Sequence, residues 1–160
     1  MVTSKFVNAV RSGYGGVNYT NVFITGASLG GGLAMISGAQ TATPTVAISG
    51  PGPLLPRKVF SPPLSLESID SNVFNFIPER DYIARLGGRP MFYQNAICTA
   101  SNNNLFGCHS MWRSFCEINY RCGSNGRPVA CRCVTQFGYP LPVQNGTRSF
   151  EDACQQANKT

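Results

Sequence analysis

A stretch of ten residues, FITGASLGGG (23–32), constrains the fold of this chain more than any other segment. Four of the ten are glycines, which cost free energy inside regular structure, so the stretch needs a special backbone conformation. It overlaps an apolar run, NVFIT (21–25), which predicts a strand buried on both faces. It continues into LGGGLAMISGAQ (29–40), which predicts a helix. Three apolar side chains of this helix would pack inward: Leu33, Met35 and Ile36.

The junction between strand and helix has the form G-x-S-x-G, with Gly26 and Gly30 two residues before and after Ser28. Such a turn holds the serine in a strained backbone conformation and points its hydroxyl above the sheet. The turn would crowd both glycine positions, so that only very small residues fit there. The backbone N–H of Leu29 lies at the helix N-terminus, where it could donate to an oxyanion. The pattern predicts Ser28 as a nucleophile; the alternative is a glycine-rich turn with an incidental serine.

A serine nucleophile needs a base, and His109 is the one histidine of the chain. It lies C-terminal to the predicted strands, where the last member of a catalytic triad falls. Among the seven carboxylates, Asp81 follows a third predicted strand, SNVFNFI (71–77), at the edge of the sheet where catalytic groups collect. Glu79, two residues from Asp81, is the alternative acid. The order Ser28, Asp81, His109 is that of an α/β-hydrolase.

Other segments agree with a parallel α/β sheet. PTVAISG (44–50) predicts a second buried strand, and residues 3–11 predict a short helix. Residues 51–66 hold five prolines, which exclude a regular element. A strand, a helix, a second strand and a further strand at this spacing are typical of a parallel sheet.

Two of these segments resemble class 3 lipases, the family of fungal-type triacylglycerol lipases and their relatives. NVFITGASLGGGLAMISGAQ resembles the family's nucleophile segment, V-x-V-T-G-H-S-L-G-G-A-L-A, with Ala27 in place of the histidine. VFNFIPERDYIARLGG is similar to the segment R-V-x-N-x-x-D-x-V-P-x-L-P, which places the catalytic aspartate on Asp81. GCHSMWRSFC, around His109, looks more like the autophagy-associated vacuolar phospholipase branch. The resemblance covers roughly residues 3–112.

The resemblance implies an α/β-hydrolase fold in residues 1–112. From about residue 113 the composition changes, and we expect an irregular, cysteine-rich, disulfide-stapled tail in residues 113–160. The family's lid and second oxyanion donor lie before the nucleophile strand, where this chain has about twenty residues. We therefore expect the chain to hold only the C-terminal half of the parallel sheet, with the missing N-terminal half of the same protein as a partner. The outer edge of the strand at 21–25 would then be open.

The implied function is that of a serine carboxylic-ester hydrolase acting on lipid esters, either triacylglycerol or phospholipid, through an acyl-enzyme. It needs no cofactor or metal, and its partners would be the lipid ester and a transient lipid–water interface. An apolar segment that includes Leu54, Leu55 and Phe60 would line the acyl site; alternatively, this segment is an ordinary surface loop. A different class of function is also open: an inactive hydrolase fragment that serves as a disulfide-stapled binding or structural domain.

Cysteines and charges set further limits. All seven cysteines lie in the last two-fifths of the chain: Cys98, Cys108, Cys116, Cys122, Cys131, Cys133 and Cys154. Without a C-x-x-C pair, and with one histidine, disulfides are favoured over zinc, with at least two bridges in the tail and one cysteine left over. Sequons at Asn18, Asn145 and Asn158 agree with a secreted or lumenal protein, in the secretory pathway or a vacuole. The net charge of +6 comes from scattered residues, which does not indicate a nucleic-acid partner.

Overall fold

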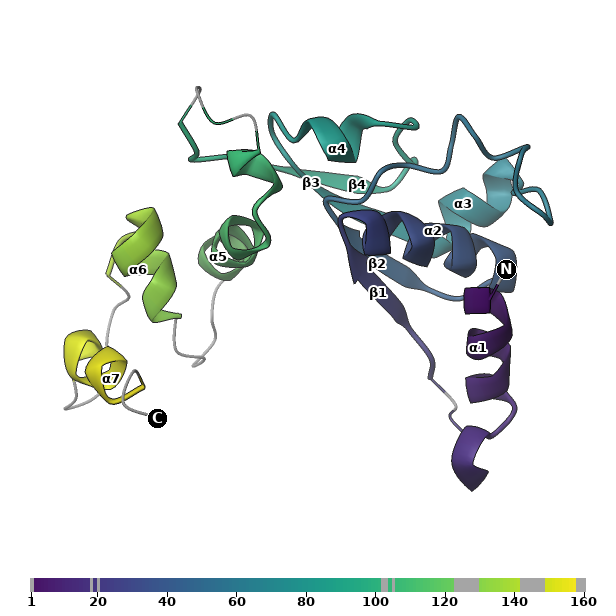
Figure 1. Cartoon of the computed structure of the whole chain (residues 1–160), viewed down its shortest axis with the longest axis horizontal. Coiled ribbons are helices and arrows are strands. Elements are labelled where there is room, and N and C mark those ends of the chain that lie inside the picture. The colour runs from purple at the N-terminus through teal and green to yellow at the C-terminus, as the bar shows by residue number, and fades with distance from the viewer. Residues whose placement is uncertain are drawn as a thin grey trace. The chain divides into compact units, whose positions relative to one another are not determined.

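Figure 1 shows the computed structural model of the chain. The residues that it describes are 2–17, 19, 21–101, 104, 106–122, 130–141 and 149–157. The chain divides into two compact units, Met1–Met111 and Trp112–Thr160. The asparagines of all three sequons lie outside the described residues: Asn18, Asn145 and Asn158.

The first unit contains a parallel sheet of four strands in the order β1–β2–β3–β4. In chain order the strands are β1 (Ile24–Ala27), β2 (Thr45–Ile48), β3 (Val73–Pro78) and β4 (Tyr93–Ala96). All three neighbouring pairs run parallel, so the unit is a mixed α/β structure, as the sequence predicts. The sequence does not predict β4, because its four residues, YQNA, include no β-branched side chain and three of them are exposed.

Helix α2 packs on the sheet and forms the core of this unit. The three longest helices of the unit are α1 (Val2–Arg11), α2 (Leu29–Thr41) and α3 (Leu66–Asn72). α2 contacts β1 and β2 as well as α1 and α3 (Figure 1). Met35 is fully buried in a cluster with residues of β2, β3 and α3, and Ile36 packs against it. Leu33 is 40% exposed, so the prediction that it packs inward is wrong. The reason is that it lies about 200° around the helix from Met35.

Among the described residues, the face of the sheet toward α2 is buried, whereas the opposite face is exposed at Val46 and at the start of β3 and becomes buried only toward the end of β3. Ala47 of β2 is paired with Asn75 of β3, and both are buried on the side of α2. Val46 and Phe74, paired one position earlier, point to the opposite face and are exposed. Phe23, just before β1, is 73% exposed. The prediction that the first two strands are buried on both faces is therefore wrong, since the described residues cover only one face of these two strands.

The described part of residues 112–160 is largely helical, so the prediction of an irregular tail is wrong. The helices are α5 (Met111–Cys122), α6 (Cys131–Phe137) and α7 (Phe150–Ala157). The disulfide Cys116–Cys133 joins α5 to α6, and Cys131–Cys154 joins α6 to α7. Cys116 and Cys133 are fully buried, so bridged sulfur occupies the place that aliphatic side chains hold in a larger core. This explains why apolar periodicity did not reveal the helices.

A third disulfide, Cys98–Cys108, lies in the first unit. The side chain of Cys122 lies outside the described residues. Disulfides persist in oxidising compartments, so these three bridges fit a secreted or lumenal protein.

None of the helices described has both the length and the apolar character needed to cross a membrane.

Peptide mapping without reduction should recover three bridges: Cys98–Cys108, Cys116–Cys133 and Cys131–Cys154. Trypsin cleaves after Arg132, between Cys131 and Cys133, so the two bridges of α6 can be told apart. Each bridge is expected to contribute about 2–4 kcal/mol to the free energy of unfolding. A linked peptide pairing Cys116 with Cys131, or free thiols at these positions, would contradict the structure.

Candidate active site

Ser28 lies between the end of β1 and the first residue of α2. Its backbone has φ 53° and ψ −128°, a region that residues other than glycine rarely adopt and that costs about 1–3 kcal/mol. The Ser28 N–H donates to the carbonyl oxygen of Ile48 (3.0 Å), and the Ser28 carbonyl accepts from the N–H of Gly32 (3.1 Å). These bonds to β2 and α2 hold the serine in the strained conformation that the G-x-S-x-G pattern predicts.

The two glycines of the pattern differ in how much space surrounds them. A Cβ atom added at Gly26 would lie 2.3 Å from the carbonyl oxygen of Gly30, so this position admits no side chain. A Cβ added at Gly30 would meet nothing within 4 Å outside its own helix, so the prediction that Gly30 must be small is wrong. Gly31 and Gly32 are needed for a different reason. A Cβ atom added at Gly31 would lie 3.0 Å from the Gly50 Cα, and one added at Gly32 would lie 2.9 Å from the Pro51 Cγ.

This difference gives a matched pair of variants. Gly26→Ala should lower the free energy of unfolding by about 1–3 kcal/mol, because the methyl group must displace backbone of the turn. Gly30→Ala should be neutral or stabilising by up to about 1 kcal/mol, since alanine favours a helix over glycine. Urea denaturation of the two variants beside the parent protein measures both values. Equal losses in both variants would contradict the described geometry.

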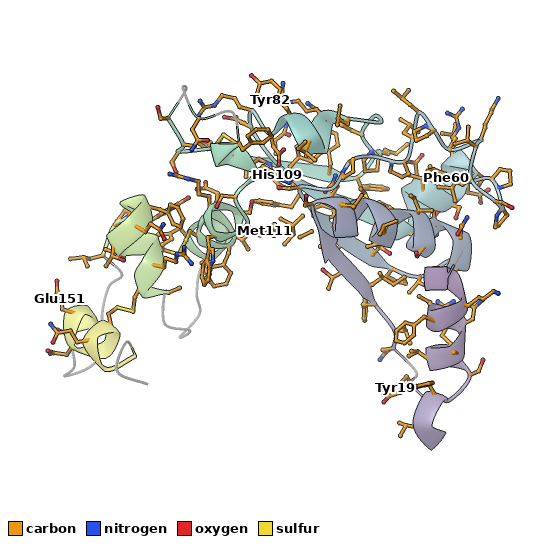
Figure 2. All side chains as sticks on the ribbon, viewed as in Figure 1. Tyr19, Phe60, Tyr82, His109, Met111 and Glu151 are labelled. Atoms are coloured by element: carbon orange, nitrogen blue, oxygen red, sulfur yellow. A yellow bond between two sulfur atoms is a disulfide. The ribbon has the colours of Figure 1, made fainter. Side chains whose placement is uncertain are left out.

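His109 joins the serine to a carboxylate. It ends a short 3₁₀ helix, η2 (Gly107–His109), and Figure 2 shows its side chain among those at the end of the sheet. The His109 Nε2 lies 2.6 Å from the Ser28 Oγ. The His109 Nδ1 lies 3.0 Å from both oxygens of Asp81. Because an ionised carboxylate can only accept, Nδ1 carries the proton and Nε2 is free to accept one from the serine.

Asp81 is fixed by its own helix. It is the N-cap of α4 (Tyr82–Arg85), and its Oδ1 accepts from the N–H groups of Ile83 (3.0 Å) and Ala84 (3.1 Å). Its side chain is completely buried, whereas the His109 side chain is 19% exposed. Glu79, the alternative acid, is exposed on the same turn, while His109 pairs with Asp81. The structure thus brings together Ser28, His109 and Asp81.

Exposed apolar or aromatic side chains lie close to these three residues along the sequence. Leu29 is the first residue of α2, and its side chain is exposed. Its N–H group has no acceptor within the helix, because it lies in the first turn. Tyr82, next to Asp81, and Phe106 are also exposed. The carbonyl of Phe106 accepts from the N–H of His109 (3.0 Å). The sequence analysis missed Tyr82 and Phe106. The available signal was their position in the sequence, one residue after the candidate acid and three residues before the candidate base.

The predicted acyl-binding residues lie elsewhere. Leu54 and Phe60 are half-buried and pack against the core cluster around Met35. Leu55 is 72% exposed. Figure 2 shows Phe60 far from His109, toward the other end of the first unit. These positions favour the alternative that this segment is a surface loop covering the core.

No group of three or more histidine, cysteine or acidic side chains among the described residues could hold a metal ion. Comparison with known proteins adds no relative: no family model matches the chain, and no curated protein matches it significantly.

Proposed function

We propose that this chain is a serine carboxylic-ester hydrolase with an α/β-hydrolase topology, related to class 3 lipases. One observation carries the proposal. The Ser28 Oγ lies 2.6 Å from a histidine nitrogen, and the other ring nitrogen lies 3.0 Å from both oxygens of the buried Asp81. The serine is also held at positive φ between a strand and a helix, as the nucleophile of this fold requires.

In the proposed reaction, Ser28 attacks the carbonyl carbon of the ester while His109 takes the serine proton at Nε2. Asp81 stabilises the imidazolium that forms, and the N–H of Leu29 donates to the oxyanion. His109 then gives its proton to the departing alcohol. Water attacks the resulting acyl-enzyme with His109 as the base, which releases the acid and restores Ser28.

The proposed substrates are lipid esters. Exposed side chains within three positions of the reacting groups in the sequence, Leu29, Tyr82 and Phe106, are apolar or aromatic. Exposed apolar side chains favour an acyl chain over a charged substrate, because burying apolar surface against them is favourable by about 25 cal/mol per Å².

Labelling with a fluorophosphonate tests the proposal, because this probe phosphonylates an activated serine. The label should map to Ser28 and be absent in Ser28→Ala. Ser49→Ala is a matched control: Ser49 also directly follows a strand of the sheet at positive φ, but its hydroxyl is buried and has no hydrogen-bond partner among the residues that the structure describes. This control should label like the parent. A folded protein that does not label would support the non-catalytic, disulfide-stapled alternative.

A further inference from the structure

Arg80 has an unusual backbone and a role within the fold. It lies between Glu79, whose N–H bonds to the end of β4, and the candidate acid Asp81, and its φ is 62°. Its guanidinium Nη2 donates to the carbonyl oxygens of Cys98 and Ala100, both at 2.8 Å. Arg80 therefore connects the turn that carries the acid to the loop that leads to His109.

The disulfide Cys98–Cys108 closes this connection into a ring. Arg80 and Asp81 are joined by a peptide bond, and Asp81 bonds to the His109 Nδ1. His109 is joined by a peptide bond to Cys108, which is bridged to Cys98. The carbonyl of Cys98 accepts from Arg80, which completes the circuit. Every link is a covalent bond or a hydrogen bond of at most 3.0 Å.

The surroundings leave this ring little freedom to move. Cys108 is buried, and a Cβ atom added at Gly107 would lie 2.6 Å from the Cβ of Ala100. The N–H of Ala100 also lies 3.5 Å from the Cys98 sulfur. The loop segments around Ala100 and Gly107 are thus in contact with each other. Arg80 anchors the first of these segments to the turn that carries Asp81.

We propose that Arg80 and the Cys98–Cys108 disulfide are positioning groups that hold His109 between Asp81 and Ser28. The inference rests on the proposed function, because it assigns these groups to the same site. Opening the ring at either place lets the imidazole leave its position while the serine and the acid stay in place. Reduction of this disulfide consequently lowers the rate of hydrolysis. Misplacing a catalytic group by about 1 Å can cost on the order of 10²-fold in rate.

Variants of Arg80 test the hydrogen-bonded link. Arg80→Ala should lower kcat on the order of 10²-fold with little change in KM, and Arg80→Lys should retain an intermediate kcat. Arg80→Gly relieves the positive φ but removes the guanidinium, so it should be as impaired as the alanine variant. Arg85→Ala, at the exposed end of α4, is the matched control and should keep the parent kcat. Full activity in Arg80→Gly would overturn the proposal, since the backbone alone would then matter.

The double variant Cys98→Ser/Cys108→Ser tests the covalent link. It should lose kcat to a similar extent and become insensitive to further treatment with dithiothreitol. Cys131→Ser/Cys154→Ser, which removes a disulfide from the other unit, should keep the parent kcat. Equal kcat values in the two double variants would overturn the proposal.

A spectroscopic measurement separates this inference from the proposed function. Because His109 is the one histidine, imidazole ¹⁵N and ¹H spectra of the chain contain a single set of signals. The parent should show a downfield Nδ1 proton bonded to Asp81, whether or not it hydrolyses esters. Arg80→Lys, the mildest substitution, should shift or broaden this signal, and opening the disulfide should remove it. If the Nδ1 proton signal were unchanged in Arg80→Lys and in the protein without the disulfide, the positioning role of both groups would be overturned. If the parent protein showed the signal but did not hydrolyse esters, the proposed function alone would be contradicted.

Discussion

Replacing Ser28 by alanine is expected to lower kcat/KM for ester hydrolysis by roughly 10³-fold or more, and His109→Ala should do the same. The reason is that the two residues act as one unit. Without the hydroxyl no acyl-enzyme forms, and without the imidazole nothing takes its proton across the 2.6 Å contact. Initial rates with a chromogenic ester of a medium-chain fatty acid measure the loss, and the double variant should be no worse than either single one.

The histidine prediction is the sharper one, because the chain has no second histidine to replace it. Ser110→Ala, the neighbouring residue, is a suitable control for disturbance of the loop and should keep most of the activity. Unchanged turnover in His109→Ala would exclude the triad, whatever the serine variant shows.

Asp81→Asn is expected to lower kcat by about 10³–10⁴-fold. An asparagine can keep the cap of α4, because its carbonyl oxygen can still accept from the Ile83 and Ala84 N–H groups. Its amide, however, presents a donor to the His109 Nδ1, which favours the tautomer with the proton on Nε2. That nitrogen can then no longer accept the serine proton. The fold should therefore persist while turnover is lost, as circular dichroism and steady-state kinetics on one sample would show.

Glu79→Gln provides the matched control for Asp81→Asn. The two carboxylates lie two residues apart on one turn, but Glu79 is exposed and Asp81 is fully buried. The glutamine variant should hydrolyse esters at nearly the parent rate. Loss of activity in Glu79→Gln, with retention in Asp81→Asn, would reassign the acid.

The parallel sheet could be predicted where strands are apolar. PTVAISG contains β2, whereas NVFIT and SNVFNFI overlap β1 and β3 with bounds that differ by up to a few residues. β4 could not be predicted, because its pairing with β3 rather than its composition makes it a strand. The helices of residues 112–160 were missed for a related reason: disulfides hold them together, and sequence alone does not give disulfide connectivity.

The three residues of the candidate site could be predicted because chemistry restricts the choice. The chain offers one histidine, one G-x-S-x-G turn, and one aspartate on the turn that follows a strand at the required edge. The acyl-binding residues could not be predicted, because apolar side chains in a proline-rich loop serve equally well as a cover for the core. The contacts of Arg80 were also invisible, since they end on backbone carbonyls, which no side-chain pattern reveals.

Trapping the acyl-enzyme tests the central claim most directly. The protein is mixed with excess chromogenic ester, quenched with acid within the first turnover, and digested for mass spectrometry. The account predicts one acyl group per chain, attached to the Ser28 Oγ and absent in Ser28→Ala. Hydrolysis of the ester without an acyl group on Ser28, or with the acyl group on another residue, would contradict it.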